Sequence, residues 1–172
     1  SGEFNSNNDI TIDGTLYSTT SIGAVNKNEN KEVTGPAQNV TINGDVFLYG
    51  YQSPKQVDKD GNPLWSFASI RAKKLTIGQN ARVNVKDKIS FTNDAEVNGA
   101  VHVGKTMEVN NLTIGSTGNV SSDISIKVKN ALTMNGGKLA VDYLNVTDNT
   151  YTSDGTEKKK TADGTATATL NG

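Results

Sequence analysis

Short apolar–polar–apolar triplets recur along most of this chain, and their spacing is its strongest pattern. Alternate side chains of a β-strand point to opposite faces, so each triplet predicts a short strand with two residues turned inward. The triplets fall into three interleaved columns that share a period of about 19 residues. The first column begins at Ile70, Ile89, Met107, Ile126 and Leu144, the second at Leu75, Ala95, Leu112 and Leu132, and the third at Val83, Val101, Val120 and Leu139.

A repeat of this kind predicts an all-β fold, a parallel β-helix or β-solenoid with three short strands in each turn. Strands of successive turns would pair at about 4.8 Å, and like residues would stack inside the rod. Two inward files are expected: Ile70, Ile89, Met107, Ile126 and Leu144, and Ile77, Val97, Ile114 and Met134. We predict about seven turns, because triplets also occur before and after the regular region.

Upstream, the columns continue only if the repeat accepts insertions. Val40-Thr41-Ile42 and Val46-Phe47-Leu48 are assigned to columns one and two, and Trp65-Ser66-Phe67 to a delayed column three. All the extra residues would then enter between columns two and three, where Asn135-Gly136-Gly137 is expected to be the uninserted corner. Insertions on one face of a solenoid often mark its binding face. The expected loops lie near 19–32, 49–64 and 152–164.

The pattern indicates one structural unit. Residues 1–8 combine an opening that resembles a cloning-tag remnant, Ser1-Gly2-Glu3-Phe4, with a polar segment. Residues 9–172 are interpreted as a single solenoid segment excised from a longer protein, because solenoids normally end in polar caps.

Composition narrows the possible partners. The net charge is −1 with both signs mixed along the chain, which argues against nucleic acid as a partner. No apolar run reaches the roughly 18–20 residues that span a bilayer, so we expect no membrane insertion of this segment. The chain has no cysteine, which excludes disulfides and thiolate metal sites.

Few residues suggest catalysis or metal binding. His102 is predicted to point outward without a second histidine, and Asp58-Lys59-Asp60-Gly61-Asn62 fits a hairpin turn better than a cation site. Glu108 and Lys127 are predicted to form a surface ion pair between turns. The outward files place no two carboxylates on adjacent turns, so we expect no enzymatic activity, no catalytic residue, no cofactor and no metal.

Two groups of residues are candidates for a binding surface. Trp65 is expected to pack at the edge of the core or under the loop, whereas Tyr49 and Tyr51 are expected to be exposed and able to stack on a sugar or a protein. Both groups lie at predicted insertions. The aromatic group is Phe47, Tyr49, Tyr51 and Trp65, and the basic group is Lys158, Lys159 and Lys160.

The stretch ISIKVKNALTMNGGKLAVDYLNV, residues 124–146, resembles the repeats of filamentous-haemagglutinin-like exoproteins. The period of about 19 is also similar to passenger repeats of self-associating and diffuse-adherence autotransporters. This resemblance to type V secreted adhesins implies a right-handed helix, secretion to the bacterial cell surface, and a role in adhesion, autoaggregation, biofilm formation or virulence. The implied partner is a host-cell protein or glycan, or the same protein on a neighbouring cell, with weak self-association.

Other readings of the same pattern stay open. A glycan-active β-helix enzyme fragment, a purely structural spacer and a bactofilin-like filament module are all compatible with a solenoid. A left-handed hexapeptide helix is disfavoured, because its spacing is strictly six residues whereas the step between columns two and three varies here.

Overall fold

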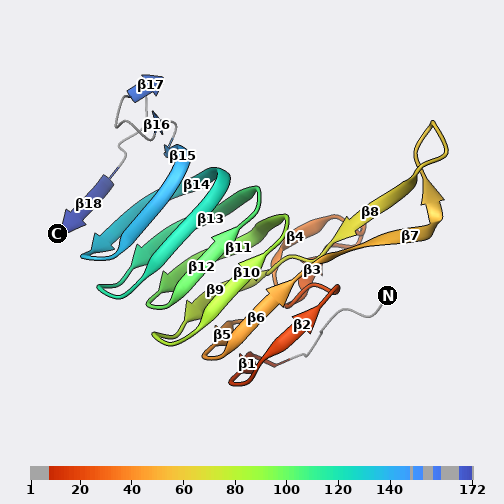
Figure 1. Cartoon of the computed structure of the whole chain (residues 1–172), viewed down its shortest axis with the longest axis horizontal. Coiled ribbons are helices and arrows are strands. Elements are labelled where there is room, and N and C mark those ends of the chain that lie inside the picture. The colour runs from red at the N-terminus through yellow and green to blue at the C-terminus, as the bar shows by residue number, and fades with distance from the viewer. Residues whose placement is uncertain (1–7, 148, 153–156, 160–166, 172) are drawn as a thin grey trace.

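The computed structural model describes residues 8–147, 149–152, 157–159 and 167–171, with side chains for 8–147 apart from Pro54. The described chain is an all-β parallel solenoid without a helix, and its strands lie one above another like rungs (Figure 1). About four turns, from Ile70 to Val141, follow one another without insertion. The predicted solenoid is confirmed, whereas the predicted count of seven turns is not.

The second column forms one continuous stack of parallel strands. Leu75, Ala95, Leu112 and Leu132 lie in register, as the repeat predicts. The strands of this stack, in spatial order, are β1 (Ile10–Ile12), β5 (Val40–Ile42), β9 (Ala72–Ile77), β11 (Lys88–Val97), β13 (Thr106–Ile114), β14 (Asn119–Asn135) and β18 (Thr167–Asn171).

The third column forms a second parallel stack. Val83, Val101, Val120 and Leu139 are in register here. Its strands are β2 (Leu16–Ser18), β6 (Asp45–Leu48), β10 (Arg82–Val85), β12 (Ala100–Val103), the first residues of β14, and β15 (Lys138–Val146).

The first column is built from parts of longer strands. Ile89 pairs with Met107, Met107 with Ile126, and Ile126 with Leu144, so this predicted file is confirmed over these turns. Register shifts in β11, β13 and β14 turn the chain from the first column into the second. An isolated parallel bridge between Ile22 and Ile70 extends the column upstream.

The core fills the inside of the rod along its whole described length. Ile70, Ile89, Met107, Ile126 and Leu112 have no exposed surface, whereas Leu144 and Met134 at the downstream end of the files are partly buried. Each turn is covered by one neighbouring turn above and another below. The apolar side chains are therefore buried by the stacking of turns and not by any single turn.

The assignment of the upstream triplets is wrong by one column. Val40–Ile42 pairs with Leu75–Ile77 and therefore belongs to the second column, not the first. Val46–Leu48 pairs with Val83–Val85 and belongs to the third. The triplet Trp65-Ser66-Phe67 is not a solenoid strand, because it pairs antiparallel with the segment before it.

The insertions form antiparallel hairpins at two different corners. β3 (Val25–Lys27) with β4 (Val33–Pro36), and β16 (Asn149–Thr152) with β17 (Glu157–Lys159), leave between the first and second columns. β7 (Gly50–Val57) with β8 (Pro63–Phe67) leaves between the third and first columns. The prediction of one common corner between columns two and three is therefore wrong.

The corner between columns two and three stays short because its backbones approach closely. A Cβ atom on Gly44 would lie 2.1 Å from the Gly14 carbonyl oxygen, and one on Gly99 would lie 2.3 Å from that of Gly78. Asn135-Gly136-Gly137 continues this series, since a Cβ on Gly137 would lie 2.4 Å from the Gly115 oxygen. These glycines serve stacking, and the corner carries no insertion in the described chain.

Candidate functional site

The β7–β8 hairpin, called the arm below, projects beyond the stacked strands (Figure 1). Its two strands pair antiparallel from Gly50 opposite Phe67 to Val57 opposite Pro63. At the base, the Ala68 amide donates a 3.1 Å hydrogen bond to the Tyr49 carbonyl oxygen, which closes the hairpin where it meets the rod.

A chain of side-chain contacts fixes the base of the arm to the solenoid. The Asp87 carboxylate is only 12% exposed and forms an ion pair with Lys105, with Nζ 2.7 Å from Oδ1. The same ammonium lies 5.1 Å from the centre of the Phe67 ring, a cation–π distance. Gly50 leaves room for that ring, because a Cβ there would lie 2.5 Å from it. The arm is therefore oriented by the rod rather than tethered loosely.

The arm carries large apolar side chains in solvent. Trp65 is 56% exposed and stacks on Phe67 with the ring centres 5.8 Å apart. Tyr49 and Tyr51 are 43% and 36% exposed, as expected from the sequence. The expectation that Trp65 packs at the core edge is wrong, since β8 is a hairpin strand with no core to face. Val57 and Leu64 are exposed on the same arm.

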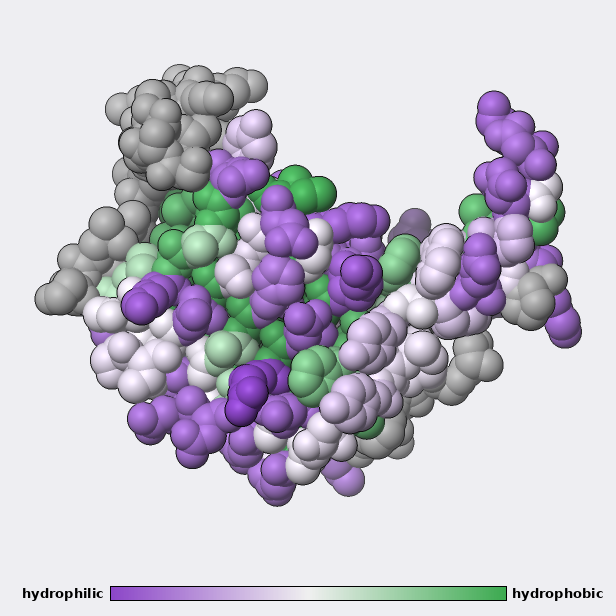
Figure 2. Space-filling view, in the orientation of Figure 1, coloured by the Kyte–Doolittle hydropathy of each residue, from purple (hydrophilic) through white to green (hydrophobic). Residues whose placement is uncertain are grey.

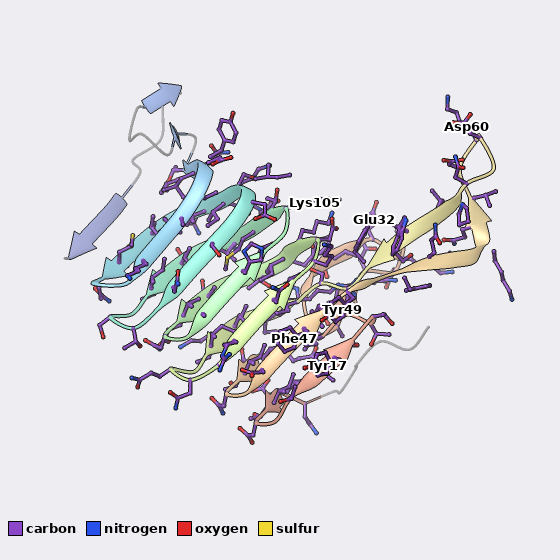
Figure 3. The ribbon with its side chains drawn as sticks, in the orientation of Figure 1. Tyr17, Glu32, Phe47, Tyr49, Asp60 and Lys105 are labelled. Carbon is purple, nitrogen blue, oxygen red and sulfur yellow. The ribbon has the colours of Figure 1, made fainter. Side chains whose placement is uncertain are left out.

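A second aromatic group lies beside the arm on the outer face of the third column. Tyr17 of β2 and Phe47 of β6 are stacked with ring centres 4.9 Å apart, and Tyr49 follows Phe47 along the chain (Figure 3). Phe47 is half-buried under this contact, whereas Tyr17 is exposed. Tyr17 is not among the candidates named from the sequence, although its triplet and that of Phe47 lie in the same column.

The tip of the arm is a hydrophilic turn (Figure 2). Asp58 Oδ1 accepts hydrogen bonds from the amides of Asp60 and Asn62, both at 2.9 Å. These hydrogen bonds lower the pKa of Asp58 below its ordinary value, and the bond from the Asn62 amide has the largest effect. The carboxylate is thus used inside the turn, which confirms the turn reading of this stretch.

Other polar candidates form surface pairs. His102 Nδ1 lies 3.0 Å from Ser121 Oγ and Nε2 lies 3.5 Å from Asp123, on the outward face as predicted. Glu108 pairs at 3.1 Å with Lys129, so the predicted partner Lys127 is wrong. Lys127 is in register with Glu108, but Lys129, two positions further along the same strand, is the residue that reaches the carboxylate.

Further carboxylates on the outer surface also carry cations. Glu96 lies 2.8 Å from Lys74, whose hydrogen bond and charge lower the pKa of Glu96, and Asp45 lies 3.9 Å from Arg82. Such exposed pairs are typical of a solvated face and contribute little to stability.

The basic candidates fall largely outside the structural description. Lys158 and Lys159 lie in β17, whose side chains are not described, and Lys160 lies outside the described residues.

A groove of about 400 Å³ was not anticipated from the sequence. It lies between the Val33–Pro36 strand of the first hairpin and the outer face of the first column, where Lys88, Phe91 and Glu108 line it. Phe91 has φ 59° and is 52% exposed. No sequence signal marks this position, because phenylalanine is not a residue that favours the left-handed region.

The described residues lack two specific features. No group of three or more His, Cys, Asp or Glu side chains there is arranged to hold a metal ion. That part of the chain also contains no helix long and apolar enough to cross a membrane. Scans against protein-family models, curated proteins and solved structures gave no match to this chain.

Proposed function

We propose that this chain is a non-catalytic adhesin segment of a bacterial cell surface, a rigid solenoid that presents the arm for attachment to host cells or to neighbouring cells. The observation that carries the proposal is the arm itself, which holds Trp65 and Tyr51 in solvent next to the exposed Tyr49, on a base that contacts Lys105. Large apolar side chains that gather on a projecting element do not help to form the core. Such exposed groups commonly mark a site of interaction with a partner.

The composition of the arm favours a binding role. Trp and Tyr are the residues enriched among those that dominate binding energy, because they bury a large area with few rotatable bonds. The polar tip from Asp58 to Asn62 would form a hydrated rim beside them. The chain's net charge of −1 also allows identical rods to approach side by side.

The handedness of the rod and its total number of turns are part of the same proposal. The solenoid is right-handed, which the family resemblance and the strong right-handed preference of parallel crossovers support. The upstream strands β1, β2, β5 and β6 and the downstream strand β18 supply the additional turns that bring the total to about seven.

Substituting Trp65 tests the proposal. Beads coated with the purified chain are expected to attach to cultured epithelial cells or to aggregate with one another, and Trp65→Ala should reduce that process at least about tenfold, as for a binding hot spot. The counts of attached and clustered beads are the measurement.

Tyr143→Ala is a matched control, because Tyr143 is a similarly exposed aromatic residue on β15, away from the arm. This control should retain full attachment. Wild-type beads that neither attach nor aggregate, or a Trp65→Ala variant that behaves as wild type, would refute the role of the arm.

A further inference from the structure

The groove beside the first hairpin is a separate surface from the arm. Its wall is the strand Val33–Pro36, and its floor includes Ser90, Glu108 and Asn110 on the outer face of β11 and β13. Its volume of about 400 Å³ falls within the range of about 300–1,000 Å³ that is usual for small-ligand sites.

Phe91 adopts a backbone conformation that its own side chain disfavours. A bulky residue at φ 59° is an outlier, and such residues persist where the surrounding structure holds them, often at ligand sites. Phe91 lies at the register shift of β11 between Ile89 and Thr92. β14 has an extra residue at the equivalent place, between Val128 and Ala131, with no left-handed residue there. The bulge therefore does not require the strain, which instead leaves an aromatic ring exposed at the groove.

Positively charged side chains outnumber negatively charged ones in the lining of the groove. Lys129 pairs with Glu108 at 3.1 Å, and both side chains remain substantially exposed. Lys88 also lines the groove, and within the described chain no carboxylate lies within ion-pair distance of it. Two ammonium groups thus face one carboxylate, so the groove favours an anion. Asn110 adds an amide, which donates to Asn93 at 3.3 Å and keeps its own oxygen as an acceptor.

The floor of the groove offers no free strand edge to a peptide. Peptides commonly bind by adding a strand to a free sheet edge. The floor strands are paired on both sides, β11 with β9 and β13, and β13 with β11 and β14. Their backbone groups are used within the solenoid, so recognition by the floor comes from side chains.

We propose that this groove binds a saccharide unit that carries a carboxylate, such as a uronic acid residue of an acidic glycan. The exposed face of Phe91 suits the apolar face of a pyranose ring, and the ammonium of Lys88 suits the carboxylate. Ser90 and Asn110 supply hydroxyl and amide groups for the sugar hydroxyls. This site does not depend on the arm, and it holds whether or not the arm mediates adhesion.

A paired glycan array tests the site. The purified full chain is applied to uronic-acid-containing glycans, each printed beside its carboxyl-reduced counterpart. At least one acidic glycan should bind, with binding at least about tenfold weaker after carboxyl reduction and at least about tenfold weaker for Lys88→Ala. Phe91→Gly should also weaken binding, while its thermal unfolding midpoint should be no lower than that of the wild type, because glycine accepts this φ freely.

Lys59→Ala, which removes an exposed lysine from the tip of the arm, is the charge-matched control and should bind as wild type. Absence of binding to every acidic glycan would overturn the proposal, as would equal binding to the reduced counterparts. Equal losses for Lys59→Ala and Lys88→Ala would also overturn it, because binding would then reflect bulk charge. Substituting Trp65 should leave the array result unchanged, so failure of the arm and failure of the groove are distinguishable.

Discussion

Replacing Gly99 with alanine is expected to destabilise the solenoid by about 3 kcal/mol, because the added methyl group has no space. Its Cβ would lie 2.3 Å from the carbonyl oxygen of Gly78 and 2.5 Å from that of Ala81. Both are backbone atoms of the turn beneath, and neither can rotate away. The stacked strands would have to separate at this corner, which would disturb the buried residues Val97 and Val101 on either side of it.

Gly14→Ala is the matched control at the same corner. A Cβ on Gly14 meets nothing within 4 Å, since no described turn lies beneath it. This variant should match the wild type or be slightly more stable, because alanine restricts the unfolded chain. Thermal unfolding followed by far-UV circular dichroism should show a midpoint about 6–12 °C lower for Gly99→Ala only. Equal midpoints for the two variants would show that close stacking is not what the corner glycines provide.

The same corner explains which part of the fold the sequence could predict. The period of about 19 and the alternation within each triplet determine which side chains point inward, and Ile77, Val97, Ile114 and Met134 stack as predicted. A triplet does not, however, carry the identity of its column. Val40-Thr41-Ile42 would suit any column, and a step of six residues separates it from Val46 just as six separate Ala95 from Val101.

The missing information lay in the corners rather than in the strands. Asp13-Gly14, Asn43-Gly44 and Asn98-Gly99 each follow a second-column strand and precede a third-column strand. Aligning these dipeptides would have placed Val40–Ile42 in the second column and moved the arm to a different corner. Tight backbone stacking, which leaves no room for a Cβ atom at Gly44 and Gly99, is the physical link between that signal and the fold.

The groove could not be predicted in the same way. It depends on how the first hairpin folds back over the first column, a tertiary contact between Val33–Pro36 and residues more than 50 positions later. It also depends on Phe91 in the left-handed region, which no local propensity favours. The exposed Trp65 has a similar cause, because its triplet pattern suits a core strand but its pairing partner is the other strand of a hairpin.

Removing the whole arm is expected to abolish attachment and aggregation while the solenoid stays folded. Deleting residues 50–67 joins Tyr49 to Ala68, whose amide already lies 3.1 Å from the Tyr49 carbonyl oxygen. The corner between Leu48 and Ile70 would then consist of Tyr49, Ala68 and Ser69. The next two turns make this corner with the same number of residues, Lys86-Asp87-Lys88 and Gly104-Lys105-Thr106, so the shortened corner has precedents within the same rod.

The deletion variant should unfold within a few degrees of the wild type, since the arm contributes little to the core and a shorter loop closes at lower entropic cost. A variant in which residues 59–61 are replaced by Asn-Gly is the matched control: it keeps Trp65, Tyr49 and Tyr51 and closes the arm with a two-residue hairpin turn between Asp58 and Asn62, whose backbone groups already form a hydrogen bond. Coated beads should attach or aggregate with this control and not with the deletion. Attachment that survives the deletion would move adhesion away from the arm and onto the faces of the rod. Attachment lost in both variants would assign recognition to the polar tip, because only the tip is altered in both.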